Sequence, residues 1–257
     1  MAQRNWNRDE LLLAFNLYCK IPFGRMHWST PEVIELSTLI GRTPSAVAMK
    51  LVNFASLDPA HQRRNVAGLK NAGRGDREIF DEFASNWEQL AFESEQARDR
   101  ILLPTPDSAK PIEAITENEG PTDREQLVRV RTVQRCFRQS VLASYKNQCA
   151  VCGIGVVELL NASHIIPWNQ NVKRRADPTN GLALCSLHDR AFDRGFIAVD
   201  SEFRVLVSDP LRIAAPPEVH RVALIAIEGK TLMLPHRFSP DAEALRFHRD
   251  NIFRSPK

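Results

Sequence analysis

The chain has 257 residues, of which 43% are hydrophobic and 25% charged, an ordinary composition for a globular protein with a buried core. This length predicts one large domain or two small ones. A net charge of +3 permits nucleic-acid binding without proving it. The first ten residues are polar and no apolar run approaches a membrane span, so we expect neither a signal peptide nor a membrane partner. Five cysteines, an odd number with metal-like spacing, predict a reducing, cytoplasmic location.

Three helices are predicted near the N-terminus, over residues 7–20, 30–40 and 43–54, where apolar residues recur at helical spacing. Asn7, Thr30 and Thr43 can cap them, and Gly41 ends the second. Helix, short glycine turn, helix is the pattern of a helix-turn-helix. We expect residues 1–92 to form a helical domain that either binds DNA or packs as a small bundle. The candidates for DNA contact are Arg42, Ser45 and Lys50.

A basic run interrupted by glycines follows, and it suits either phosphate contact or a solvated loop. Residues 76–92 then predict one helix that Asp76 caps. From residue 93 to 125, four prolines and an acidic composition predict a linker. Helical periodicity returns over residues 127–145, with an arginine face opposite an apolar face. Cys19 and Cys136 fall in apolar helical patterns and are expected to be core thiols.

Four soft ligands form two pairs. Cys149 and Cys152 make a C-x-x-C pair, and Cys185 and His188 make a C-x-x-H pair, with 32 residues between Cys152 and Cys185. Two such knuckles joined by a loop match a closed tetrahedral zinc site.

Other residues with catalytic potential lie between these knuckles and just after them. His164 titrates near neutral pH and suits a general base. Asn180 precedes Gly181, where its amide can brace a tight loop. Asp189 and Asp193 are four residues apart, on one face of a helix, and are hard oxygen ligands for Mg²⁺ or Mn²⁺. Asp193 has the alternative of capping or of bridging to a neighbouring arginine, and His188 has the alternative of binding this second ion.

The remaining residues predict two hairpins and a final helix. Alternation over residues 196–208 and 221–235 predicts the hairpins, and residues 241–253 predict the helix. His236 and His248 lack metal partners at a useful spacing, so they are expected to be structural.

The stretch from about Arg131 to Gly195 resembles the HNH endonuclease family, in its bacterial restriction-endonuclease branch. The resemblance implies a ββα-metal nuclease domain over residues 126–257, in an α+β protein. His164, Asn180 and Asp189 occupy the three family positions, and His188 takes the last ligand position of a zinc knuckle. Ser163 departs from the family, which carries Asp or His there to bind the catalytic metal.

The implied function is a metal-dependent endonuclease that cleaves double-stranded DNA in restriction or phage defence, with a homodimer as a candidate assembly. His164 would activate water, while Asp189, with Asp193 or Ser163, would hold Mg²⁺ or Mn²⁺. Two other classes stay open: a non-catalytic zinc-stapled nucleic-acid-binding protein, favoured by Ser163, and an interaction module in a larger defence complex. Phosphate contacts are expected from the basic side chains of the arginine helix and the central loop, unless these are simply solvated: Arg131, Arg135, Arg138, Lys146, Lys173, Arg174 and Arg175.

Overall fold

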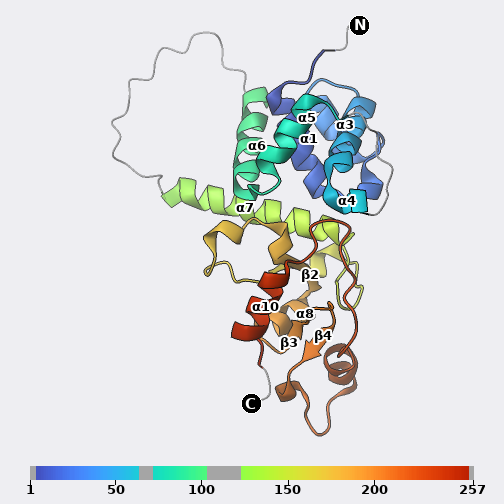
Figure 1. Ribbon diagram of the computed structural model, residues 1–257, viewed down its shortest axis with the longest axis vertical. Coiled ribbons are helices and arrows are strands. Elements are labelled where there is room, and N and C mark those ends of the chain that lie inside the picture. Colours follow the sequence, from blue (N-terminus) through green and yellow to red (C-terminus); the bar gives the residue numbers. More distant parts are fainter. Residues whose placement is uncertain (1–3, 64–71, 103–122, 255–257) are drawn as a thin grey trace. The chain divides into compact units, whose positions relative to one another are not determined.

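The structure is a computed structural model that describes residues 4–63, 72–102 and 123–254 (Figure 1). The chain divides into two compact units, Met1–Cys136 and Phe137–Lys257. Most of the predicted linker, residues 103–122, and most of the basic run lie outside the described residues. The expected mixed α and β class is confirmed, while the domain boundaries at residues 92 and 126 stay a prediction.

The first unit is helical and is organised around α1. Its helices are α1 (Arg8–Lys20), α2 (Pro31–Leu39), α3 (Pro44–Leu57), α4 (Pro59–Arg63), α5 (Arg74–Phe83), α6 (Trp87–Leu102) and the first part of α7 (Asp123–Ser144). α1 contacts α2, α3, α5 and α6. Its Phe15 ring lies 5.1 Å from that of Phe54 and 5.6 Å from that of Phe80, in tilted and edge-on contacts that aromatic rings prefer.

Capping residues set the helix starts in this unit. The Asn7 side chain accepts a hydrogen bond from the Glu10 backbone N–H, and the Glu10 carboxylate accepts one from the Asn7 N–H, which completes a capping box. Thr43 accepts from the Ala46 N–H at the start of α3. A turn with Gly41 at φ +64° separates α2 from α3, as the sequence predicts. Whether these two helices act as a helix-turn-helix stays a prediction.

Two expectations for this unit are corrected. The single helix expected over residues 76–92 is two helices, because the chain turns at Ala84–Asn86. Asn86 starts α6, since its carbonyl accepts from the Leu90 N–H and its side chain bonds to Gln89. Asp76 does not cap α5 from outside; it lies in the first turn and accepts from the Gly73 N–H. Residues 93–102 belong to α6, so the first part of the predicted linker is helical.

The second unit is built on a β-hairpin followed by a short helix. β1 (Leu160–His164) pairs antiparallel with β2 (Gly181–Cys185), so that His164 lies opposite Gly181 and Leu160 opposite Cys185. α8 (Ser186–Asp193) follows β2 directly and contacts both strands. This order of hairpin and helix is the ββα arrangement expected from the sequence. Short 3-10 turns complete the central part: η2 (Val157–Leu159), η3 (Val172–Arg174) and η4 (Pro178–Asn180).

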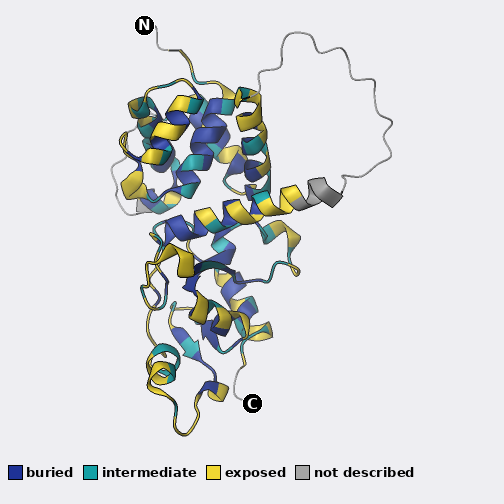
Figure 2. Cartoon of the chain, turned by 180° about the vertical axis from the view of Figure 1, so that it is seen from behind, coloured by how far each residue is buried: buried dark blue, intermediate teal, exposed yellow. Residues whose placement is uncertain are grey.

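The hairpin packs closely on the second part of α7. A Cβ atom at Gly181 would lie 2.5 Å from Val141 and 2.9 Å from Phe137, so only glycine fits at this contact. Leu182, Leu184 and Leu160 are buried in the same core, which Figure 2 colours dark blue. α7 therefore fixes the strand end that carries His164.

The C-terminal part differs from the sequence expectation in one place. β3 (Ile197–Val199) and β4 (Val205–Val207) form the first expected hairpin, and α10 (Ala242–Asn251) is the expected final helix. Between them lie η5 (Asp209–Leu211), α9 (Glu218–His220) and a π-helical turn, η6 (Arg221–Ile225). The second hairpin is therefore wrong: residues 221–225 are helical, because an apolar run this short does not distinguish strand from helix.

α10 is anchored to α8 by a buried histidine. The His248 ring stacks on Phe192 with centroids 3.7 Å apart and hydrogen-bonds to the Phe192 carbonyl. Burial lowers the pKa of His248 to about 4, so the ring is neutral and structural, as expected. No helix among the described residues is long and apolar enough to cross a membrane.

Candidate active site and metal centre

Cys149, Cys152, Cys185 and His188 converge, with their ligand atoms all within 4.8 Å of one another. The Sγ atoms of Cys152 and Cys185 are 3.8 Å apart, and His188 Nδ1 lies 3.6 Å from Cys149 Sγ and 3.1 Å from Cys185 Sγ. Tetrahedral zinc with bonds of about 2.1–2.3 Å would separate its donors by about 3.5–3.8 Å. The four side chains therefore have the identity and nearly the spacing of a closed metal site.

The backbone holds this cluster together without disulfides. The Ala150 N–H donates to the Ala183 carbonyl, which ties the first knuckle to β2. Desolvation, with the neighbouring cysteines, raises the pKa of Cys152 to about 12 although the residue is partly exposed. Without a cation this thiol keeps its proton at neutral pH, and a divalent ion would displace it.

His188 faces the cysteines through Nδ1 because Nε2 is engaged elsewhere. Nε2 lies 2.9 Å from the Ala223 carbonyl, which can only accept, so Nε2 carries the proton and Nδ1 has the free lone pair. This carbonyl belongs to the π-helical turn η6. The geometry places His188 with the three cysteines, and its alternative role at the second ion stays a prediction.

His164 ends β1 in an aromatic setting. Its ring stacks on Phe137 of α7 with centroids 3.8 Å apart and meets Trp168 edge-on at 5.5 Å. His164 Nε2 lies 2.9 Å from the Arg175 carbonyl, so Nε2 is the donor and Nδ1 is left as the basic nitrogen. Burial lowers the pKa of His164 below 6.5, which keeps the imidazole neutral at pH 7.

The carboxylates of Asp189 and Asp193 on α8 face Asn161 and Ser163, which precede His164 on β1. The Asn161 amide donates to Asp189 Oδ2 at 2.8 Å, and the Ser163 hydroxyl donates to Asp193 Oδ1 at 3.4 Å. Asn161 and Ser163 are two residues apart and so lie on one face of the strand. Desolvation and the nearby Asp189 charge raise the pKa of Asp193, although the residue as a whole is exposed. A divalent cation would relieve the repulsion between these two carboxylates, and their role as its ligands stays a prediction.

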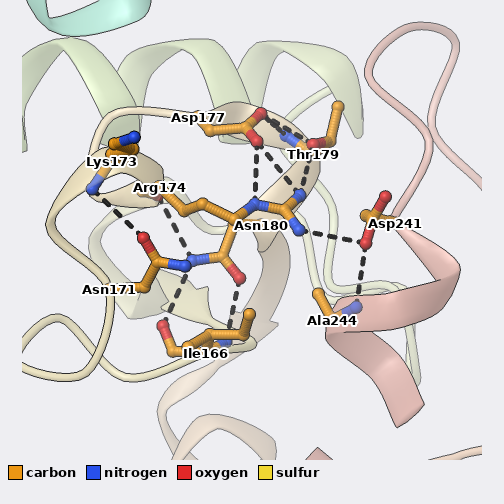
Figure 3. A network of polar contacts seen from close by, with 9 residues as sticks. All are labelled: Ile166, Asn171, Lys173, Arg174, Asp177, Thr179, Asn180, Asp241 and Ala244. Atoms are coloured by element: carbon orange, nitrogen blue, oxygen red, sulfur yellow. Dashed lines mark hydrogen bonds and ion pairs between the residues drawn. The ribbon is translucent and has the colours of Figure 1, made fainter. Parts of the chain in front are cut away.

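Asn180 braces the central loop from inside and is 1% exposed. Its Oδ1 accepts from the Ile166 N–H at 2.8 Å, and its Nδ2 donates to the Ile166 and Arg174 carbonyls at 3.1 and 3.3 Å (Figure 3). These contacts are all with backbone atoms, so Asn180 braces the loop before Gly181 as the sequence predicts, and a catalytic role for it stays a prediction.

Several of the expected phosphate-binding residues have partners inside the protein. Arg174 pairs with Asp177 and with Asp241, the cap of α10 (Figure 3). Arg138 donates to the Leu160 and Val157 carbonyls, and Arg175 donates to the Trp168 carbonyl. In the first unit Arg42 pairs with Glu10, Lys50 with Asp76, and Arg135 with Glu95. Ser45, Arg131 and Lys173 are exposed, and phosphate contact by any of these residues stays a prediction.

Sequence reasoning missed Asn161, Phe137 and the Arg175 carbonyl. Asn161 could have been predicted from the sequence, because it is a polar residue on the same strand face as Ser163. The Phe137 stack and the Arg175 hydrogen bond join distant or irregular segments, for which the sequence has no periodic pattern.

Comparison with known proteins found similarity to parts of the chain. Residues 149–200 match the sequence model of the HNH endonuclease family. The chain therefore carries an HNH endonuclease domain, and the resemblance is confirmed. A solved structure, a modification-dependent TagI restriction endonuclease, is similar at 22% identity and a TM-score of 0.32 over 45% of this chain and 37% of that chain. The similarity thus spans well under half of that enzyme's length. No curated protein matches the chain.

Proposed function

We propose that the protein is a metal-dependent endonuclease that hydrolyses phosphodiester bonds in double-stranded DNA. The observation that carries this proposal is the hydrogen bond between His164 Nε2 and the Arg175 carbonyl. It leaves a neutral imidazole with a basic Nδ1 at the end of a strand whose previous residue contacts Asp193. A neutral histidine at the end of β1 and a carboxylate pair on α8, in an HNH endonuclease domain, are the kinds of group that hydrolysis of a phosphodiester needs.

In this proposal His164 Nδ1 accepts the proton of a water molecule that attacks the scissile phosphorus in line. Asp189 and Asp193 would hold Mg²⁺ or Mn²⁺, since carboxylate oxygens are the ligands that these ions prefer. When bound, the ion would neutralise charge on the phosphate and on the leaving 3′ oxygen, so products would keep 5′ phosphates. Asn161 fixes the Asp189 carboxylate, and Ser163 supports Asp193 in place of an acidic ligand.

The cysteine cluster would hold a structural zinc ion. Its four protein ligands leave no open position, which is the arrangement of structural and not catalytic zinc. The donor set is soft and the carboxylate pair is hard, so the two sites would select different ions.

Cleavage of supercoiled plasmid tests the proposal. Protein freed of loosely bound ions by gel filtration should nick or linearise plasmid after Mg²⁺ or Mn²⁺ is added, and the His164→Ala protein should not. A wild-type protein that binds plasmid but never cuts it, with either ion, would favour the non-catalytic zinc-stapled binding protein. Parallel digestion of modified and unmodified phage DNA tests the proposed restriction role.

A further inference from the structure

A pocket of about 500 Å³ lies in the first unit, between the N-terminal segment and α3. This volume falls within the range of sites for small organic ligands. Its lining includes Arg4, Trp6, Ser45, Met49, Lys50 and Asn53. Ser45 and Lys50, two of the residues expected to contact DNA, thus meet in one hollow.

The charge of the lining favours an anion. Two cationic side chains, Arg4 and Lys50, line the pocket, and no acidic residue does. The balancing carboxylates, Glu10 and Asp76, are 2% and 1% exposed and lie outside the lining. Lys50 Nζ is 2.7 Å from Asp76 Oδ1 and its side chain is only 12% exposed, so the ammonium is fixed before any ligand arrives.

Asn53 adds a planar polar group beside this ammonium. Its Nδ2 donates to Asp76 Oδ2 at 3.2 Å, which sets the orientation of the amide. Among the described residues no donor reaches Asn53 Oδ1, and one N–H of the amide is left over. A paired donor and acceptor of this kind matches the edge of a nucleobase, as asparagine does with adenine.

Trp6 and Met49 supply the apolar walls. The Arg42 guanidinium lies 4.2 Å and the Lys50 ammonium 4.9 Å from the Trp6 ring centroid, and these cation–π contacts hold the indole in place. Met49 is 53% exposed at the pocket. Trp6 and Met49 both line the pocket, so they can contact the apolar surface of a base.

We propose that this pocket binds a nucleotide, with the base against Trp6 and Asn53 and the phosphate near Lys50 and Arg4. The same chemistry recognises a unit of a DNA strand and a free nucleotide. The inference does not depend on the nuclease activity, because the pocket uses residues of the first unit alone.

Titration of ¹⁵N-labelled full-length protein by NMR tests this at single residues. The ligands are dAMP, a single-stranded oligodeoxynucleotide and inorganic phosphate, each without Mg²⁺ or Mn²⁺. The Trp6 indole and Asn53 amide signals should move in a saturable way with dAMP or the oligonucleotide, while the exposed Trp28 indole should not. If the two signals shift with the oligonucleotide alone, the natural ligand is a DNA strand; if they shift with dAMP, it is a free nucleotide.

Variants that add a negative charge to the lining test the proposal further, and a variant with the same charge outside the lining is the matched control. Met49→Glu and Ser45→Glu change exposed positions of the lining, so both should fold, and each should weaken nucleotide binding about tenfold or more by repulsion. Ile34→Glu places the same charge on an exposed position of α2 outside the lining and should bind as wild type. Three results would overturn the proposal: no shift with either nucleotide ligand, equal shifts at Trp28, or phosphate shifting Trp6 and Asn53 as strongly as dAMP.

Discussion

Replacement of His164 by alanine removes the proposed base and three contacts of its ring. Besides the more distant edge-on contact with Trp168, the ring loses two close contacts, the stack on Phe137 and the hydrogen bond to the Arg175 carbonyl. A neutral hydrogen bond contributes about 1 kcal/mol and an aromatic pair about 0.5–1.5 kcal/mol, so the variant should lose about 1–3 kcal/mol of unfolding free energy. Domains of this size have about 5–15 kcal/mol, and the protein should therefore stay folded.

The effect on cleavage should be much larger than the effect on folding. A general base contributes about 10²- to 10⁴-fold to the rate of the chemical step. A stability loss of about 1–3 kcal/mol leaves nearly all molecules folded and cannot account for such a decrease. DNA affinity should stay at the wild-type level, because binding rests on lysine and arginine contacts to phosphate.

Plasmid cleavage in Mn²⁺, gel-shift affinity and urea unfolding should be measured on the same preparations. His164→Gln separates the two roles of the ring, since the glutamine amide nitrogen reaches the place of Nε2 and can still donate to the Arg175 carbonyl, but it cannot act as a base. His27→Ala, at an exposed histidine of the first unit, is the matched control and should cut as wild type. If the His164→Ala protein cut plasmid at the wild-type rate, the assignment of the base would be refuted.

Three further predictions concern the metals and the pH profile. Elemental analysis should find a single zinc ion in the wild-type protein. The Cys149→Ser protein should lose this ion and, with it, the cooperative unfolding of the second unit. A zinc-free wild type would contradict this prediction. Asn161→Ala should raise the Mn²⁺ concentration for half-maximal cleavage about 10- to 100-fold, as expected when a support of a metal ligand is lost, and an unchanged value would argue against that support. Because burial lowers the pKa of His164, the neutral base persists below pH 6.5, and the acid limb of cleavage should have its midpoint below that value; a midpoint above 7 would count against it.

Features encoded over short stretches of sequence were predictable. The C-x-x-C and C-x-x-H pairs gave the metal cluster, because two ligands three residues apart need only a local turn to converge. The caps at Asn7 and Thr43 likewise depend on atoms within three residues. The hairpin and α8 were predicted from the order of residues in the HNH family. Local periodicity alone would not have distinguished this hairpin from other short strands.

Long-range polar pairs were not predictable in the same way. Arg42 reads as a surface cation beside a helix start, yet it pairs with Glu10, 32 residues earlier. Arg174 belongs to a basic triplet, yet it links the loop to Asp241, 67 residues later. Charge in the sequence shows that a side chain needs a partner; only the fold determines whether that partner is a phosphate or a carboxylate.

Ser163, which replaces the acidic or histidine ligand of the family, has a contact in the structure that changes its interpretation. A serine in place of an acidic ligand suggests a weakened catalytic ion site, and it favoured a non-catalytic protein. The structure instead gives each α8 carboxylate a neutral donor from β1, Asn161 for Asp189 and Ser163 for Asp193. Neutral donors orient carboxylates without cancelling their charge, so the pair keeps its attraction for a cation.

Consecutive residues of α8 connect the two proposed metal sites. His188 turns toward the cysteines and the Ala223 carbonyl, while Asp189 turns toward Asn161 on β1. Neighbouring residues on a helix point about 100° apart, so a rotation of α8 that released His188 would also move the Asp189 carboxylate away from its donor. The cluster also holds β2 through the Ala150 hydrogen bond, and β2 lies opposite His164 in the hairpin. An ion bound by the cysteines would therefore set the spacing of the catalytic groups without touching a substrate.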